Sequence, residues 1–278
     1  MPTLVIHSPR LSDAQTQTLT RELDCQPRLC DNHFRAELEH GVARDTLNRL
    51  RERLSLDINL LPADFAADQV RLLLTDMDST LINIECVDEI ADFVGVKPQV
   101  SAITEAAMRG EIDFATSLQQ RVSLLAGLDV DALAQVYEQR LQLNPGAEAL
   151  MSGLRERHIK RALVSGGFTF FTSRLGQRLA LDFALANELD IEDGHLTGRL
   201  RGDIVGGEAK AAFLQRLCAE LDISPRQVIA MGDGANDLPM LELAGLGVAY
   251  HAKPAVGAQA DVLLRHRGLD AVLDFLPA

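Results

Sequence analysis

The residues best suited to chemistry in this sequence are acidic side chains that follow apolar runs. Asp76 and Asp78 belong to the segment DMDST after one run, and Asp233 and Asp237 belong to GDGAND after another. Crowded carboxylates repel one another, and a divalent cation relieves that repulsion. Oxygen ligands of this kind suit Mg²⁺, which keeps several of its own waters and needs few protein carboxylates. We therefore expect Asp76, Asp233 and the backbone carbonyl of Asp78 to bind Mg²⁺.

The same region contains residue types that bind and transfer a phosphoryl group. Such a transfer needs an in-line nucleophile, a proton for the leaving oxygen and positive charge near the phosphoryl oxygens. Asp76 can form an aspartyl-phosphate, while Asp78 protonates the leaving group and then activates water. The Ser165 hydroxyl and the Gly166 amide, at the predicted start of a helix, can bind phosphate. Lys210 adds a fixed positive charge.

Each of these features also has an interpretation without chemistry. The segment DMDST can be an acidic turn or a helix cap, the segment SGG is most often a turn, and a lone lysine is usually exposed. The GDGAND segment lacks the alternating ligands and the final Glu of a calcium-binding loop. Their shared position favours the chemical interpretation, because reactive groups gather beyond the carboxyl ends of strands in open α/β sheets.

The elements that would position these residues are predicted by apolar runs. Near-continuous runs, as expected for a sheet covered on both faces, predict strands at residues 70–75, 161–164, 183–186, 228–231 and 246–249. Helical patterns lie between several of them, at residues 147–157, 168–179 and 208–221. This alternation predicts an α/β fold with a doubly wound, Rossmann-like parallel sheet. An Asp-Gly pair at 193–194, flanked by apolar residues, predicts a short hairpin.

Two further regions lie outside this predicted core. Residues 85–144 have helical patterns and little strand character, which predicts a helical cap inserted after the first core strand. The catalytic core would then consist of residues 69–84 and 145–278. Residues 1–66 show a β-α-β-α pattern that ends near a Leu-Pro linker, and they predict a small N-terminal α/β domain.

Composition limits the class of partner. The chain has 278 residues, 47% of them hydrophobic, and its formal net charge of −13 would repel nucleic acids and anionic lipid surfaces. No apolar run approaches the roughly 18 residues of a membrane span, and the first residues lack a signal-peptide pattern. We expect a cytoplasmic protein without nucleic-acid or membrane partners, whose four cysteines are reduced.

From residue 70 to the C-terminus, these motifs resemble the haloacid dehalogenase-like superfamily and, within it, the phosphoserine phosphatases. The matching features are the segments LLTDMDST, LVSGG and MGDGAND together with Lys210. The resemblance implies that Asp76 is the nucleophile and Asp78 the general acid and base. It implies roles toward phosphate and Mg²⁺ for further residues: Ser165 and Lys210 bind phosphate, Asn236 approaches it, Asp233 is a metal ligand and Asp237 orients a metal-bound water.

The resemblance also implies that the cap selects the substrate. Glu85 would pair with the ammonium group of phosphoserine, Arg121 would pair with its carboxylate, and Phe114 would exclude water. Without the resemblance, Glu85 and Arg121 would be interpreted as solvated helix residues. The implied reaction is hydrolysis of O-phospho-L-serine, a small-molecule phosphomonoester, to L-serine and phosphate, the last step of serine biosynthesis.

Other functions stay open at this point. A related small-molecule phosphatase, or a phosphotransferase that passes the phosphoryl group to homoserine, would use the same motifs. An amino-acid-sensing regulatory protein would depend instead on residues 1–66, which could be an ACT-like or other ferredoxin-like module. A docking or dimerisation domain without a ligand is about as consistent with those residues, and a homodimer is likewise left open.

Overall fold

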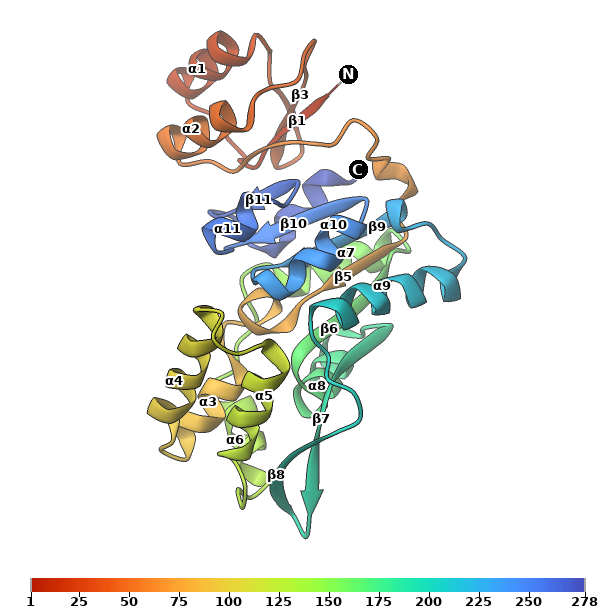
Figure 1. Ribbon diagram of the computed structural model, residues 1–278. Coiled ribbons are helices and arrows are strands. Elements are labelled where there is room, and N and C mark those ends of the chain that lie inside the picture. Colours follow the sequence, from red (N-terminus) through yellow and green to blue (C-terminus); the bar gives the residue numbers. More distant parts are fainter. Residues whose placement is uncertain (1, 278) are drawn as a thin grey trace.

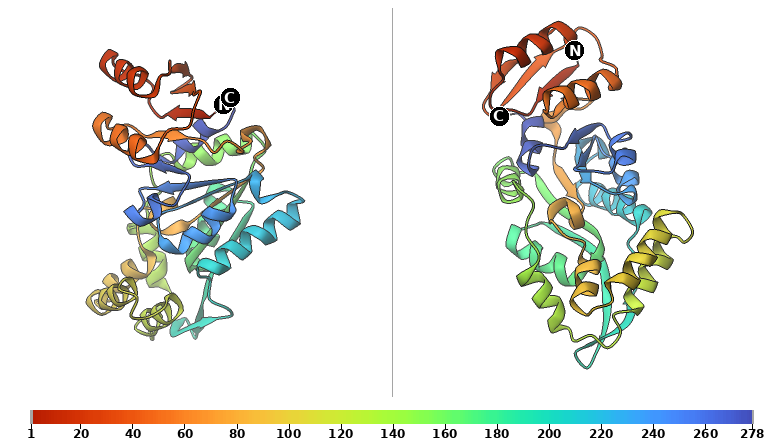
Figure 2. Two further views of the ribbon diagram at one scale, coloured as in Figure 1. Left: turned by 45° about the horizontal axis from the view of Figure 1, so that its top comes forward. Right: turned by 90° about the vertical axis from the view of Figure 1, so that its left-hand side faces the viewer.

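Two β-sheets organise residues 2–277, the part of the chain described by this computed structural model (Figure 1). A four-stranded sheet has the order β2-β3-β1-β4, and a seven-stranded sheet has the order β11-β10-β9-β5-β6-β7-β8. The first sheet belongs to the N-terminal part of the chain, and a helical segment is inserted in the second between β5 and β6. Figure 2 shows that the helical segment lies at the end of the molecule away from the N-terminal sheet.

The N-terminal sheet is antiparallel and is accompanied by two helices. Its elements are β1 (Thr3–Ile6), α1 (Asp13–Leu23), β2 (Arg28–Cys30), β3 (His33–Glu37), α2 (Arg44–Leu54) and β4 (Ile58–Leu60). The predicted β-α-β-α order is therefore wrong, because it lacks β2 and β4. Each of these two strands has three residues, which is too short for an alternating pattern to be recognised.

The seven-stranded sheet confirms the predicted doubly wound α/β core. Its strands are β5 (Leu72–Thr75), β6 (Lys160–Phe168), β7 (Phe183–Glu192), β8 (His195–Arg201), β9 (Val228–Gly232), β10 (Leu246–Tyr250) and β11 (Val262–Leu264). Neighbouring strands are parallel except for β7 and β8, which form the hairpin predicted at Asp193 and Gly194. Because β5 lies between β6 and β9, the polar groups after these strands meet at one edge.

Helices cover both faces of this sheet. They are α7 (Ala147–Glu156), α8 (Thr169–Leu179), α9 (Gly207–Leu221), α10 (Leu238–Leu243) and α11 (Pro254–Gly257), together with the 3₁₀ segment η5 (Leu269–Phe275). Alternate residues of β5 face opposite layers: Leu73 packs in one apolar cluster with Phe171. Leu72 and Leu74 pack in the other cluster with Phe213. Burial on both faces explains why the sequence of β5 is continuously apolar.

Four helices lie in residues 85–144, between the turn after β5 and helix α7, and we refer to these residues as the cap. They are α3 (Cys86–Phe93), α4 (Lys97–Met108), α5 (Phe114–Ser123) and α6 (Asp131–Gln139). The Gly127 N–H donates a hydrogen bond to the Leu196 carbonyl at 2.8 Å, and the Val130 N–H donates to Gly194 at 2.9 Å. The hairpin of β7 and β8 therefore anchors the cap to the core (Figure 1).

Asp57 and Asn59 connect the N-terminal unit to the edge of the large sheet. The Asp57 carboxylate accepts hydrogen bonds from the backbone N–H groups of residues 265–267 at 2.8 to 3.0 Å. The Asn59 side chain donates to the Leu263 carbonyl and accepts from the Leu263 N–H, both at 2.9 Å. Because Leu263 belongs to the edge strand β11, the N-terminal unit satisfies backbone groups that an open edge would expose.

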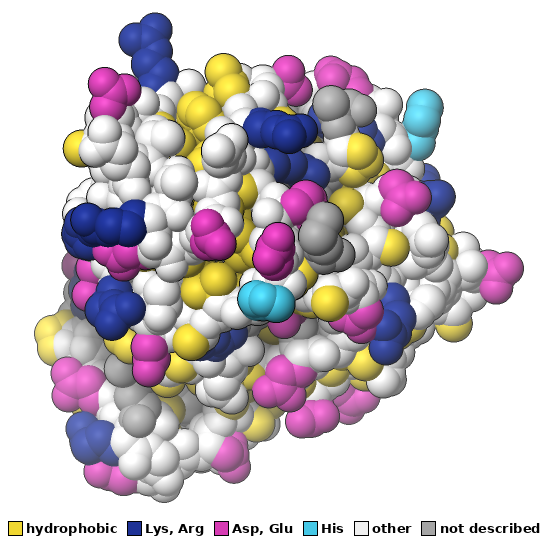
Figure 3. Space-filling model, turned by 90° about the horizontal axis from the view of Figure 1, so that it is seen from above, with side chains coloured by type: hydrophobic (Ala, Val, Ile, Leu, Met, Phe, Trp, Pro, Cys, Tyr) yellow, Lys and Arg dark blue, Asp and Glu magenta, His cyan; other side chains and the backbone are white. Residues whose placement is uncertain are grey.

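The surface of the N-terminal side carries dispersed charges. Figure 3 shows acidic and basic side chains interspersed with apolar ones on this face.

Among the helices that the structure describes, none is both long and apolar enough to cross a membrane. The four cysteines are free thiols.

Candidate active site

Asp76 stands at the carboxyl end of β5. The strand ends there because Asp76 begins a tight turn, Met77–Leu81, in which Ser79 has a φ of 57°. The Asp76 N–H donates to the carbonyl of Met231 in the neighbouring strand β9 at 2.8 Å. Strand pairing therefore holds the backbone of the expected nucleophile, and its side chain is almost completely buried.

Lys210 joins Asp76 to the GDGAND segment. Lys210 lies in the first turn of α9 with an exposed fraction of 0%, and its Nζ donates to Asp76 Oδ1 and to Asp237 Oδ1, the latter at 2.6 Å. The other oxygen of Asp237 accepts from the N–H groups of Asp233 at 3.1 Å and Gly234 at 3.0 Å. Both oxygens of Asp237 are thus bound within the protein, whereas only one oxygen of Asp76 is.

The charges of the buried side chains Asp76, Asp237 and Lys210 depend on one another. Burial and the charge of Asp237 raise the pKa of Asp76 well above its ordinary value, although Lys210 opposes this change. Burial alone would lower the pKa of Lys210, but the two carboxylates outweigh burial and raise it. An unpaired buried charge is strongly unfavourable. Lys210 therefore stays charged beside the expected nucleophile.

Asp78 has the properties of an acid and base near neutral pH. Burial and the nearby charge of Glu85 raise the pKa of Asp78 to about 7, against opposing hydrogen bonds from Cys86. One of these runs from the Cys86 N–H to Asp78 Oδ1 at 3.3 Å. A general acid works best when its pKa lies near the working pH. Asp78 can therefore both give and take a proton there.

Three carboxylates could hold a cation. Asp76, Asp233 and Asp237 each offer an oxygen within 4.8 Å of the others. Burial, Asp237 and Glu85 raise the pKa of Asp233 to about 6, and the Thr80 hydroxyl donates to Asp233 Oδ1 at 3.1 Å. Mutually repelling carboxylate oxygens fit a hard divalent cation. Since both oxygens of Asp237 already accept hydrogen bonds, Asp76 and Asp233 are the better direct ligands.

The SGG segment lies at the end of a strand, not at the start of a helix as predicted. Strand β6 continues through Phe168, and α8 begins only at Thr169. Ser165 is fully buried, and its Oγ accepts a hydrogen bond from the Gly167 N–H at 2.8 Å. A Cβ atom at Gly167 would come within 2.9 Å of Asp78 Oδ2. A side chain at position 167 would therefore crowd the carboxylate of Asp78.

A cavity of about 500 Å³ joins the core carboxylates to the cap. Its lining includes the predicted residues Asp76, Asp78, Asp233, Asn236 and Gly166 from the core and Glu85, Phe114 and Arg121 from the cap. A Cβ atom at Gly166 would come within 2.8 Å of the Phe114 ring, so Phe114 of the cap lies directly over Gly166. Burial lowers the pKa of Arg121, while Asp88 and Glu85 oppose this effect.

Three of the predicted residues do not line this cavity. Ser165, Lys210 and Asp237 are all fully buried behind its wall. Lys210 donates to the lining residue Asp76, and Asp237 accepts from the N–H groups of the lining residues Asp233 and Gly234. The Ser165 hydroxyl instead accepts from the Gly167 N–H.

Other residues at the site were not predicted. The Ser79 hydroxyl donates to Glu85 Oε1 at 2.6 Å, and Thr80 binds Asp233 as described above. Both hydroxyls directly follow Asp78 in the sequence, and that adjacency was the available signal. Lys253 also lines the cavity, but it follows a distant strand, and no spacing links it to the acidic motif.

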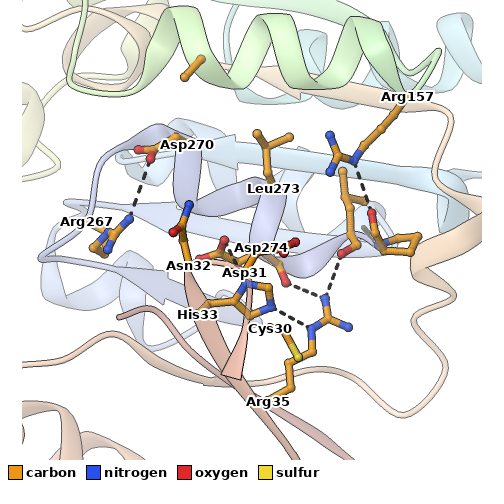
Figure 4. A pocket seen from close by; sticks show the side chains of 13 residues that line it. Cys30, Asp31, Asn32, His33, Arg35, Arg157, Arg267, Asp270, Leu273 and Asp274 are labelled. Carbon is orange, nitrogen blue, oxygen red and sulfur yellow. Dashed lines mark hydrogen bonds and ion pairs between the residues drawn. The ribbon is translucent and has the colours of Figure 1, made fainter. Parts of the chain in front are cut away.

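A second cavity, of about 400 Å³, lies between the N-terminal unit and η5 (Figure 4). Asp274 accepts from His7 Nδ1 at 2.8 Å and pairs with His33 Nδ1 at 3.3 Å, while Arg35 Nε donates to His33 Nε2 at 3.0 Å. Burial alone would raise the pKa of Asp274, but His33 and His7 lower it to about 2. The polar groups of this cavity bind mainly one another, so they join the two units.

The chain is similar to several known proteins. Residues 73–242 match the family of haloacid dehalogenase-like hydrolases. A phosphoserine phosphatase of a Polaromonas species is 54% identical over 226 residues, covering 80% of this chain and 96% of that protein. A probable phosphoserine phosphatase structure from Vibrio cholerae has a TM-score of 0.85 at 37% identity, covering 99% and 86% of the two chains. A haloacid dehalogenase family hydrolase from Salmonella enterica has a TM-score of 0.90 at 31% identity, covering 99% and 98%.

Proposed function

The chain belongs to the phosphoserine phosphatase family of the haloacid dehalogenase-like hydrolases, and we propose that it hydrolyses O-phospho-L-serine to L-serine and phosphate. One observation carries this proposal: a single cavity contains the carboxylates of Asp76 and Asp78 together with Glu85 and Arg121. Phosphoserine presents a phosphate, an ammonium group and a carboxylate. The cavity offers chemistry suited to each of the three.

The core residues supply the reacting groups. Asp76 attacks phosphorus through its carboxylate oxygen, so that an aspartyl-phosphate forms while the bond from phosphorus to the serine oxygen breaks. Asp78 gives its proton to the departing serine oxygen. It then takes a proton from the water that hydrolyses the aspartyl-phosphate. Lys210 offsets negative charge at Asp76 throughout, because it is buried and remains charged.

We assign Mg²⁺ to Asp76, Asp233 and the backbone carbonyl of Asp78, with Asp237 outside the direct ligands. When bound, the ion supplies positive charge for the phosphoryl oxygens. A chelator is expected to abolish phosphate release, and added Mg²⁺ should restore it. Mg²⁺ should also raise the melting temperature of the protein, because it binds only the folded chain. Full activity in the presence of chelator would overturn this assignment.

The cap residues supply the recognition of the amino acid. Glu85 faces the cavity at the start of α3 and accepts the ammonium group, while Arg121 of α5 binds the carboxylate. Arg121 is half-buried, and its Nε donates a hydrogen bond to the Ser117 carbonyl at 3.4 Å. Phe114 packs above Gly166 and shields the phosphate from water.

A phosphate-release screen tests the function. Phosphoserine, phosphothreonine, sugar phosphates and nucleotides are compared by kcat/KM, and phosphoserine is expected to give the highest value. Faster turnover of a sugar phosphate would overturn the substrate assignment. Addition of homoserine distinguishes hydrolysis from transfer, since a transferase would form phosphohomoserine.

A further inference from the structure

The turn after the catalytic carboxylates places a hydroxyl against the recognition residue. Ser79 has a φ of 57°, a conformation that residues other than glycine adopt infrequently. In this conformation its Oγ donates to Glu85 Oε1 at 2.6 Å. The turn is held from outside as well, because the Asn144 side chain donates to the carbonyls of Thr80 at 2.8 Å and Ile82 at 3.0 Å.

Glu85 shares its cavity with other carboxylates. Asp78 and Asp233 line the same cavity as Glu85, so three acidic side chains face one space. Glu85 is itself exposed. A flexible exposed carboxylate facing two others would turn toward solvent unless a donor held it. Ser79 is a hydroxyl donor to Glu85 on the side of the catalytic turn.

We propose that Ser79 is a positioning residue for substrate selection: its hydroxyl holds the Glu85 carboxylate toward the cavity, where it accepts the substrate's ammonium group. This inference rests on the proposed function. Ser79 does not contact the reacting atoms in this role. It acts through Glu85, and it links the segment that carries the nucleophile to the segment that selects the amino acid.

Substitutions of Ser79 test the proposal on two substrates. Ser79→Ala is expected to raise the KM for phosphoserine about tenfold, the lower end of the effect of losing a hydrogen bond to a charged group. The kcat for phosphoserine, and both constants for 4-nitrophenyl phosphate, should stay within about twofold, because the latter has no ammonium group. Ser79→Gly removes the same hydroxyl while favouring the positive φ, so it preserves the turn if alanine disturbs it.

A double-mutant cycle with Glu85→Gln separates positioning from a general effect. If Ser79 acts through Glu85, the double variant should be no worse on phosphoserine than Glu85→Gln alone. Ser152→Ala is the matched control, because Ser152 of α7 also donates to a glutamate, Glu156 at 3.4 Å, and this hydrogen bond is exposed. It should leave both substrates unchanged.

The outcomes distinguish this inference from the proposed function. Equal losses on both substrates, additive effects in the cycle, or an unchanged KM in both Ser79 variants would overturn the positioning role. A wild-type protein that does not prefer phosphoserine over 4-nitrophenyl phosphate would overturn the proposed function itself.

Discussion

Replacement of Lys210 by methionine should destabilise the protein strongly. Lys210 is fully buried and donates to Asp76 and Asp237, so Lys210→Met leaves two buried carboxylates without their cation. Removal of one partner from a buried ion pair costs about 3–5 kcal/mol. That is a large part of the roughly 5–15 kcal/mol by which a folded domain is stable. Methionine has a similar length, so a cavity adds little to the loss.

The loss of stability in Lys210→Met should depend on pH, and the direction of this dependence tests its cause. Without Lys210, the pKa of Asp76 in the folded protein should rise further above that of the unfolded chain, because Lys210 opposes this rise in the wild type. A raised acid pKa destabilises the folded state increasingly as pH rises from about 4 through the folded pKa. The difference between wild type and Lys210→Met should therefore be larger at pH 8 than at pH 5.5.

Denaturant unfolding followed by circular dichroism measures these differences. The matched control is Lys160→Met, because Lys160 pairs with Asp182 at 2.8 Å on a side chain that is 49% exposed. Lys160→Met should lower the free energy of unfolding by less than about 1 kcal/mol, and this loss should be nearly independent of pH. If Lys210→Met costs no more than this control, or if its cost does not grow with pH, the proposed compensation of Asp76 and Asp237 is refuted.

Three other changes have distinct expected results. Asp76→Asn should lower phosphate release by at least about 10³-fold with an unchanged circular dichroism spectrum, because the near-isosteric amide is a poor nucleophile; retained activity would contradict its role. Arg121→Ala should raise the KM for phosphoserine about 10- to 100-fold and change that for 4-nitrophenyl phosphate little, and equal losses would instead indicate a structural role. Asp274 has a pKa lowered to about 2, so it stabilises the folded state above about pH 4, and this contribution disappears as pH falls toward 2. Asp274→Asn should therefore lose about 2 kcal/mol at pH 5, where wild type and variant are compared by denaturant unfolding, and this difference should vanish near pH 2.

The core motifs could be located from the sequence because they end strands that are buried on both faces. Leu72, Leu73 and Leu74 make a continuous apolar run, and the carboxylates of Asp76 and Asp78 follow it directly. Parallel strands bring such polar ends to one edge of a sheet, so a joint site was predictable. The helical insertion was predictable for a related reason, since helices of that length display a periodic apolar face.

Short elements were not predictable. Strands β2, β4 and β11 have three residues each, and hydrogen bonds to neighbouring segments, not their own periodicity, hold them in place. The contact of Asn59 with Leu263 spans 204 positions, and no local pattern indicates it. The position of SGG was misjudged because β6 extends to Phe168, which depends on pairing with Asn187 of β7.

The sequence alone determined which residue types stand after which strands, and therefore the class of chemistry. Only the tertiary structure decided which contacts, and therefore which role, each of these residues has. Lys210 and Asp76 lie 134 positions apart, yet the fold buries the lysine between two carboxylates and leaves one oxygen of Asp76 free. Ser79 and Glu85 lie six positions apart, but their contact depends on a left-handed conformation at Ser79 in a turn to which the distant Asn144 donates a hydrogen bond. Charge, burial and orientation depend on neighbours in space, and a linear sequence does not specify them.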